Sequence, residues 1–362
     1  MKKIIKGIIV FLLLPGAVFS IEWIPDRTKT EAETELGWLV APMPVNVEGI
    51  GFTVPIAGVF SNFYKTTDLL LVAPFIKGDI ESKLLSIYKL PLYQDSLFFT
   101  FNYYELLTGF RNYDRGIDSE ENDYYQTLEK TDSTTFRLQT QLWDQRFEFQ
   151  LGYSYGKADI QKIYDADGNY FSNIQSPERN WIDNIIGTQI DLTDNHFDPH
   201  QGFRLGLLHS STNYGPELLS DYAVNDLNAS FYFPFFKNDT LLFNYFQSQS
   251  VVTSSGTIDQ TILGQKLGLG CDLENKQKLC ETAENRRLQY WLERNKQGKA
   301  SALGGLNRLR AYSYNRFFAK NSVNYTLEYR LNFSEKTTPI NWIFLGGVKT
   351  VLQTAFFYEA GG

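Results

Sequence analysis

The three histidines are the side chains of this sequence best suited to acid–base or metal chemistry. His196, His200 and His209 lie close together in the chain. No cysteine lies near them, and no set of carboxylates is spaced to complete a metal site. The sequence also lacks a nucleophile elbow, a phosphate-binding loop and a pair of catalytic carboxylates. We therefore predict a protein that is not an enzyme, with no metal and no cofactor.

The two cysteines are the other candidates for covalent chemistry. Cys271 and Cys280 lie in one charged segment. An oxidising compartment would allow them to close a small loop through a disulfide. Two free thiols are the alternative that the sequence leaves open, because connectivity is not fixed by sequence. Neither arrangement suggests a redox or metal site.

Alternation of apolar and polar residues is the dominant pattern of the chain. In residues 321–333, Tyr325 and Leu327 fall on one face of an extended strand, and Asn324 and Thr326 fall on the other. Such a strand separates an apolar environment from a polar one. Repeated many times in one chain, it is typical of an antiparallel transmembrane β-barrel with a polar lumen.

The pattern predicts about 13 strands. They lie at 36–42, 51–63, 67–76, 80–91, 96–110, 134–144, 146–157, 181–192, 202–211, 222–234, 240–252, 321–333 and 350–360. Long and short connections alternate: the long ones include 111–133, 158–180 and 253–320, and the short ones include 144–145, 193–201 and 235–239. Outer-membrane barrels show this asymmetry, with short periplasmic turns and longer outer loops.

The N-terminus has the features of a cleaved secretory signal peptide. Lys2, Lys3 and Lys6 precede an apolar run, and small residues end at Ser20. The apolar run is shorter than the roughly 20 residues that a membrane helix needs. We therefore expect a signal peptide at 1–20, a short periplasmic segment at 21–35, and one outer-membrane β-barrel at 36–362.

Composition narrows the function classes. No later apolar run is long enough to span a membrane as a helix, which excludes a helical membrane protein. Aromatic residues make up 15% of the chain, as expected where rings meet lipid headgroups. The net charge of −7, without a basic cluster, argues against nucleic acid as a partner. A secreted soluble β protein is the least favoured alternative.

Three stretches, in order along the chain, resemble the bacterial surface antigen family, which comprises the barrels of BamA-type and two-partner-secretion outer-membrane assembly and export factors. The first resembles the family's periplasmic turn, the second its long sixth-loop signature, and the third its twelfth and thirteenth strands. The matching residues are Asp194, Pro199 and Gly202; then Gly304, Gly305, Arg310 and Tyr312; then Glu328 and Glu359. Ala311 stands where the family usually has glycine.

The resemblance implies a latch that anchors the sixth loop inside the barrel. In the family, the loop arginine meets acids that project inward from the two strands, and Arg310, Glu328 and Glu359 stand at those positions. Strand parity supports the acids independently, because Glu328 shares a face with Asn324, and Glu359 shares one with Gln353. A guanidinium between two carboxylates makes charge-assisted hydrogen bonds.

The resemblance also implies a location and partners. The family's barrels lie in the outer membrane of Gram-negative bacteria and insert or translocate proteins, so the expected partners are outer-membrane lipid, unfolded outer-membrane or secreted polypeptides, and accessory periplasmic proteins. Residues 21–35 leave no room for the periplasmic docking modules of most members. A passive pore or structural surface antigen is the alternative. The family has about sixteen strands, so we expect a chain truncated before the last strands, or else a complete smaller barrel of about 12 or 14 strands.

Overall fold

The computed structural model describes most of the chain after residue 23. The described residues are 24–27, 36–42, 45–47, 51–54, 56–62, 70–72, 75–76, 82–94, 96–113, 118, 120–171, 179–215, 218–236, 239–268, 277–305 and 307–362. The expected signal peptide at 1–20 therefore lies outside the described residues, as does most of the segment 21–35.

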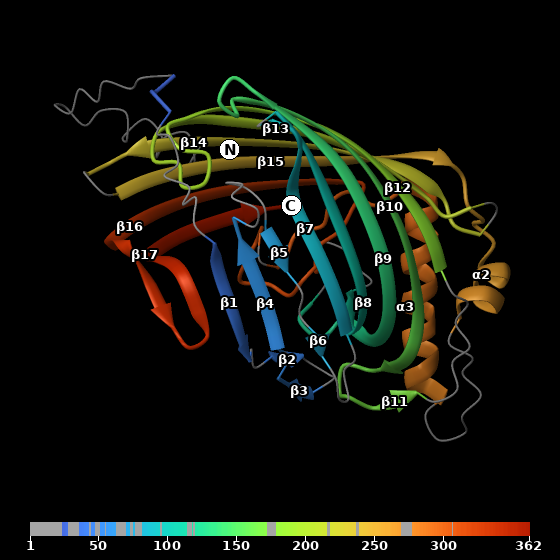
Figure 1. The fold of residues 1–362 in the computed structure, drawn as a ribbon. Coiled ribbons are helices and arrows are strands. Elements are labelled where there is room, and N and C mark those ends of the chain that lie inside the picture. The colour runs from blue at the N-terminus through green and yellow to red at the C-terminus, as the bar shows by residue number, and fades with distance from the viewer. Residues whose placement is uncertain are drawn as a thin grey trace.

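One curved antiparallel sheet makes up most of the molecule (Figure 1). Its strands are β1 (Gly37–Pro42), β4 (Ile56–Ser61), β5 (Leu70–Val72), β6 (Phe75–Ile76), β7 (Ser82–Tyr93), β8 (Leu97–Tyr113), β9 (Tyr124–Leu142), β10 (Phe147–Tyr164), β11 (Tyr170–Phe171), β12 (Arg179–Thr193), β13 (Gly202–Asn213), β14 (Asp221–Pro234), β15 (Asp239–Ser254), β16 (Asn321–Trp342) and β17 (Leu345–Gly361). β11 only extends the edge of β10, and β5 and β6 both lie between β4 and β7. Counting β5 and β6 as one interrupted strand leaves thirteen strands in this curved sheet, which we call the wall. The predicted fold class, an antiparallel all-β barrel, is confirmed.

The two ends of the sheet meet at one point. β1 pairs with β4 over six residues, and it pairs with β17 only at Trp38↔Gly346 and Leu39↔Leu345. Among the described residues, the rest of β17 has no pairing with β1, because β1 is far shorter than β17. The wall is thus joined beside the β16–β17 turn and is not closed along its whole length. A separate small pair, β2 (Val45–Val47) and β3 (Gly51–Thr53), lies outside the main sheet.

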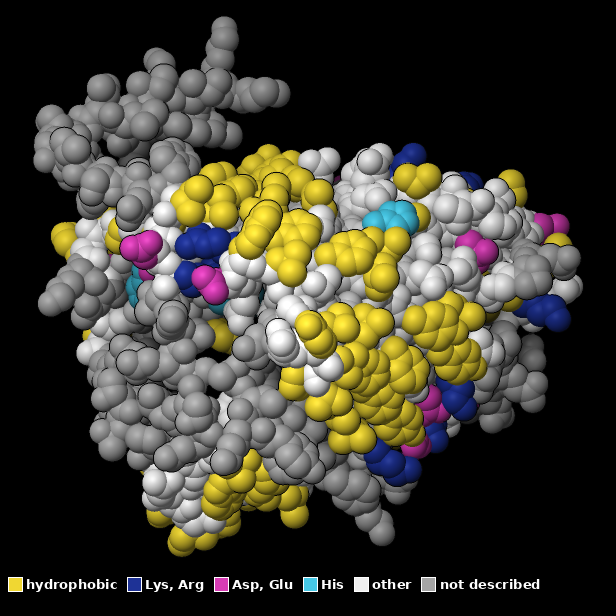
Figure 2. Space-filling model, turned by 45° about the horizontal axis from the view of Figure 1, so that its top comes forward, with side chains coloured by type: hydrophobic (Ala, Val, Ile, Leu, Met, Phe, Trp, Pro, Cys, Tyr) yellow, Lys and Arg dark blue, Asp and Glu magenta, His cyan; other side chains and the backbone are white. Residues whose placement is uncertain are grey.

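Over most of their length, the long strands have a polar inner face and an apolar outer face. On β16, Asn324, Thr326 and Glu328 are buried, whereas Tyr325 and Leu327 are each 47% exposed. Figure 2 shows hydrophobic side chains gathered in broad patches on the outer surface. Exposed members on neighbouring strands include Phe136, Leu138, Leu151, Tyr153, Ile186 and Leu207. This arrangement reverses that of a water-soluble domain, whose large apolar side chains face inward.

The strands near the long loops extend further than their sequence pattern predicts. β8 ends at Tyr113 and β9 begins at Tyr124, so the predicted loop 111–133 is mostly strand. The alternation is hidden there because Tyr125 and Ile163 pack against a loop helix and are buried like core residues. At the opposite end, β16 and β17 are joined by a short turn after Trp342, so most of residues 334–349, which separate the last two predicted strands, belong to a long hairpin.

Two helices lie in the connection between β15 and β16, where none is predicted from the sequence pattern. α2 spans Gln260–Leu267 and α3 spans Gln277–Gln297. α3 is rich in strong helix formers such as Leu, Glu, Gln, Lys and Arg. Neither helix, among the described residues, is long and apolar enough to cross a lipid bilayer. In Figure 1, α3 stands across the end of the sheet from which the long loops emerge.

Candidate functional site

The segment between α3 and β16 folds back into the lumen, the space on the concave side of the sheet. Leu303 bridges Phe317 in an antiparallel pair and packs with Leu309 against Phe246 of β15. Gly304 and Gly305 have φ of +104° and +113°. A Cβ on Gly304 would lie 2.3 Å from the Ser313 carbonyl oxygen, so glycine is needed to close this loop.

Arg310 sits at the centre of the latch that the sequence predicts. Its backbone amide donates to Glu359 Oε2 at 2.6 Å, and its Nε donates to Glu359 Oε1 at 3.1 Å. Its Nη2 donates to Glu328 Oε2 at 2.8 Å. The side chains of Glu328 and Glu359 are only 7% and 5% exposed. The structure thus brings together the three residues taken from widely separated motifs, and it shields both carboxylates from water.

Three further groups that sequence reasoning missed complete the latch. Arg330 donates to Glu328 Oε1 at 2.7 Å, so Glu328 lies between two guanidinium groups. The Thr326 hydroxyl donates to Glu359 Oε1 at 3.2 Å, which follows from the direct pairing of Thr326 with Glu359 across β16 and β17. The Phe357 ring lies under the Arg310 guanidinium, 3.6 Å from ring centroid to Cζ. All three share strand faces with the acids, so parity could have found them.

The aromatic position and the missing glycine of the signature are both accommodated. Tyr312 accepts a hydrogen bond from the Gly305 amide through its carbonyl, and its ring packs edge-on against Phe317. The non-glycine residues of this loop with positive φ are Leu309 and Asn315. Ala311 is not one of them, so the loop does not need glycine at that position.

The predicted periplasmic turn lies between β12 and β13. Asp194 Oδ1 accepts hydrogen bonds from the amides of His200 and Gln201 at 2.9 and 3.0 Å, and Pro199 is buried inside the turn. Gly202 has φ +113°, and a Cβ there would lie 2.2 Å from the Leu192 carbonyl oxygen. The motif therefore has a structural role: it fixes a tight turn between two strands.

A buried ion cluster next to this turn was missed by sequence reasoning. Asp191 is 0% exposed, and its carboxylate contacts Arg204 at 2.9 Å, His196 Nδ1 at 2.8 Å and Arg27 at 3.4 Å. Arg27 also donates to the carbonyls of Thr193 and Gln145. Asp191 stands directly opposite Arg204 in the β12–β13 register, which was the available signal. The cluster ties the segment before β1 to the turns of strands far from it in sequence.

The other two histidines have ordinary partners at separate places. His200 Nε2 lies 3.1 Å from the Asn332 amide, and His209 Nδ1 lies 2.8 Å from Asn225 Oδ1. Cys280 is disulfide-bonded and is buried beside Ala283 against β9 and β10. Cys271, the other cysteine of the chain, lies outside the described residues.

The helix α3 is held across the end of the sheet by contacts at both of its ends. Near its start, Cys280 and Ala283 pack with Tyr125 and Ile163, and at its middle Arg286 pairs with Asp123 at 3.3 Å. Near its end, the amide of Asn295 donates to the carbonyls of Leu218 and Thr257, both at 2.8 Å. Between these points, Trp291 packs with α2 in a buried apolar cluster. The long loop therefore covers this end of the lumen and also enters it.

The fold and the latch together define the class: an all-β antiparallel barrel wall with a long loop anchored on its inner side. No family model matches the chain, and no curated protein matches it. Among solved structures, the chain is similar to BamA from Haemophilus ducreyi lacking POTRA domains 1–3, with 14% sequence identity and a TM-score of 0.43. The match covers 84% of this chain and 54% of that chain, so the chain spans about half of that structure's length.

Proposed function

We propose that this protein is an outer-membrane β-barrel of the Gram-negative cell envelope, with lipid as the partner of its outer face. The single observation that carries this step is the reversed polarity of the wall. Buried polar residues such as Thr326 and Asn324 face the lumen, and exposed apolar residues such as Leu327 face outward. Water would penalise such an outer surface, whereas hydrocarbon would stabilise it.

An arginine on the outer face is expected to destabilise the protein in lipid far more than an arginine on the inner face. Leu151 of β10 is 45% exposed on the outer face, and its neighbour Gln150 points the other way. We expect Leu151→Arg to lower the free energy of unfolding in vesicles by about 2–4 kcal/mol, as lipid-facing charges do near the bilayer midplane. The matched control Gln150→Arg should cost about 1 kcal/mol or less. Urea unfolding in phosphatidylcholine vesicles measures both, and equal losses would contradict a lipid-facing β10.

We further propose that the barrel acts in the insertion or translocation of other polypeptides at the outer membrane, with accessory periplasmic proteins as additional partners. The latch supports this role, because its residues were drawn from motifs that resemble those of assembly and export barrels. Arg310, Glu328 and Glu359 meet with hydrogen-bonding geometry although they come from a loop and two strands. Breaking these contacts would release the loop, and an element that can be bound or released is one means by which proteins switch between states.

Reconstitution of the full chain tests this activity. Vesicles containing the protein should fold a second, small outer-membrane barrel several-fold faster than empty vesicles, measured by the gel mobility of the folded form. Vesicles containing the Arg310→Ala variant should lose most of this acceleration. If the full chain gives no acceleration, and its deletion leaves secretion and barrel assembly unchanged in cells, the transport role is wrong while the barrel remains.

A passive structural barrel is the second candidate, and one observation favours it. The loop between β15 and β16 occupies the lumen, and α3 crosses one end of the wall, so the described residues fill much of the interior. In that case the protein would not accelerate the folding of a second outer-membrane barrel. Single-channel recordings should then show small conductance that rises when the latch is broken by Arg310→Ala.

A further inference from the structure

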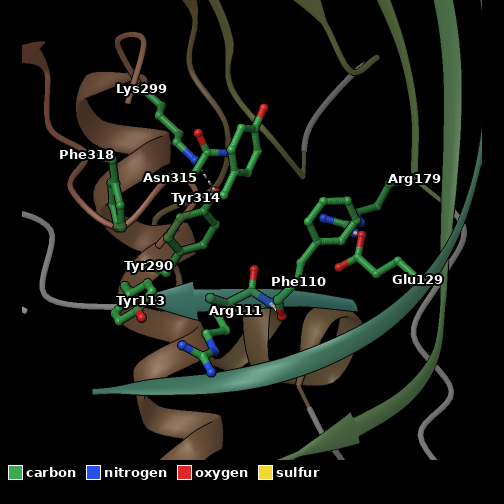
Figure 3. A pocket seen from close by; sticks show the side chains of 11 residues that line it. Phe110, Arg111, Tyr113, Glu129, Arg179, Tyr290, Lys299, Tyr314, Asn315 and Phe318 are labelled. Atoms are coloured by element: carbon green, nitrogen blue, oxygen red, sulfur yellow. Dashed lines mark hydrogen bonds and ion pairs between the residues drawn. The ribbon is translucent and has the colours of Figure 1, made fainter. Parts of the chain in front are cut away.

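A chamber lies inside the wall, beneath α3, and its lining is unusually rich in cations and aromatic rings. Figure 3 shows Arg179, Glu129 and Phe110 on one side of it, and Tyr290, Lys299 and Phe318 on the other. Its volume is about 150 Å³. A second cavity of about 260 Å³ shares Phe110, Glu129 and Arg179 with it. The chamber is therefore large enough for a small solute and continues into further space.

Two cations near the chamber, Lys299 and Arg294, have no carboxylate at ion-pair distance among the described residues. Lys299 lines the chamber together with Arg179 and one acid, Glu129. Arg179 Nη2 lies 2.8 Å from Glu129, so these two charges neutralise each other. Arg294 adds a further positive charge to an adjoining cavity that Lys299 also lines. Lys299 and Arg294 thus bring positive charge to a partly desolvated place beyond that of the Arg179–Glu129 pair, and an uncompensated charge is costly there.

Lys299 stabilises its ammonium group on rings and a hydroxyl. Its Nζ lies 5.6 Å from the Tyr290 ring centroid and 5.1 Å from that of Phe318. The Tyr290 hydroxyl lies 3.5 Å away. Among the ion pairs of the described residues, Lys299 has no carboxylate partner. Its charge is therefore held in place by cation–π contacts and remains available to an anion.

Arg294 lies in a similar cage. Its guanidinium donates to the hydroxyls of Tyr214, Tyr222 and Tyr290, and Trp291 lies 4.9 Å from its Cζ. Its side chain is 9% exposed. Neutral hydroxyls satisfy its donors without cancelling its charge.

The positive charges of these cations lower the pKa of Tyr290, a residue of α3 that contacts both Lys299 and Arg294. Burial raises the pKa of its hydroxyl, but the positive charges of Lys299, Arg294 and Arg179 outweigh burial and lower the pKa to about 8. A phenol that ionises so readily indicates a local excess of positive charge.

We propose that this chamber is a binding site for a small phosphate-bearing anion, either inorganic phosphate or the phosphate of a sugar. Guanidinium and ammonium groups that converge with hydroxyl donors match a phosphate's several acceptor oxygens. The rings of Phe110, Tyr290 and Phe318 supply apolar faces beside the charges, as ligand sites commonly do. A bound dianion would offset the charge of Lys299, which has no carboxylate partner among the described ion pairs, and part of the charge of Arg294, whose guanidinium donates to hydroxyls.

Fluorescence titration of the full chain in detergent micelles tests the site. Trp291 lies within 5.5 Å of both the Arg294 and Arg179 guanidinium carbons, so its emission should report binding. Inorganic phosphate, glucose 6-phosphate and glucose are added at constant ionic strength set with sodium chloride. We expect saturable changes with both phosphates and none with glucose. Lys299→Gln should weaken binding about tenfold.

A matched control keeps the result specific to the chamber. Lys296 lies on α3, three residues before Lys299. Its side chain is 48% exposed and pairs with Glu293, so Lys296→Gln should leave binding unchanged.

Spectrophotometric titration gives a second readout: saturating phosphate should shift the Tyr290 ionisation from about pH 8 to higher pH. Tighter binding of glucose 6-phosphate than of phosphate would identify a sugar phosphate as the ligand. Equal binding would identify free phosphate. No saturable response, or equal weakening by Lys296→Gln and Lys299→Gln, would overturn the proposal.

Discussion

Replacing Arg310 by alanine is expected to release the loop from the wall and to lower the free energy of unfolding by about 3 kcal/mol, because it leaves two nearly buried carboxylates without their shared cation. The side chains of Glu328 and Glu359 are 7% and 5% exposed. Thermal unfolding followed by gel mobility measures the stability, and limited trypsin digestion measures the release, with new cleavage expected between β15 and β16.

The two acids should respond differently when the arginine is absent. Among the described residues, Glu359 then keeps only the Thr326 hydroxyl and the amide of residue 310 as partners, whereas Glu328 keeps Arg330. Adding Glu359→Gln to Arg310→Ala should therefore restore part of the lost stability, because it removes an uncompensated charge. Adding Glu328→Gln should not, because it leaves Arg330 without its closest acid. If the two double variants were equally stable, the expected difference between Glu328 and Glu359 would be wrong.

Replacing Asp191 by alanine is expected to cause a comparable loss, about 3–5 kcal/mol, beside the β12–β13 turn. The Asp191 carboxylate is 1% exposed and contacts Arg204, Arg27 and His196. Its removal leaves two guanidinium groups close together without a counter-charge. Urea unfolding of the refolded chain measures the effect.

A nearby acid provides the control for this prediction. Asp198 is 44% exposed, and its contacts with His200 and Arg330 are long, at 3.9 and 4.0 Å. Asp198→Ala should therefore change the stability by less than about 1 kcal/mol. Arg27→Ala should free the N-terminal segment with a smaller loss than Asp191→Ala, since Arg204 remains paired. A large loss from Asp198→Ala, or none from Asp191→Ala, would show that the buried cluster does not hold this end together.

The wall was predictable because strand geometry places alternate residues on opposite faces whatever else surrounds them. Residues such as Tyr325 and Glu328 could be assigned to the outer and inner faces before the structure was known. Glu328 and Glu359 followed from the same parity, joined to a resemblance in short motifs, and Arg310 followed from the resemblance alone. The turn at Gly202 was predictable because only glycine fits that backbone.

The helices and the buried cluster were not predictable in the same way. α3 has a weak amphipathic pattern, since both Arg287 and Trp291 are buried on it, so periodicity gave no signal. Arg27 meets Asp191 across 164 residues of sequence, a distance that no local pattern encodes. The hairpin beyond Phe333 was hidden because its register shifts break the alternation at Asn332/Ser334 and again near Ile340.

The pairing of Thr326 with Glu359 has a consequence for assembly of the last hairpin. If β17 slipped by one residue against β16, every side chain of β17 would change faces. Glu359 would then turn to the apolar outer face, and Arg310 would lose one of its two carboxylate partners, so the slipped register would be destabilised twice. Only the native register of the hairpin places Glu359 where Arg310 can bind it, so the ion pair favours this register over the slipped one.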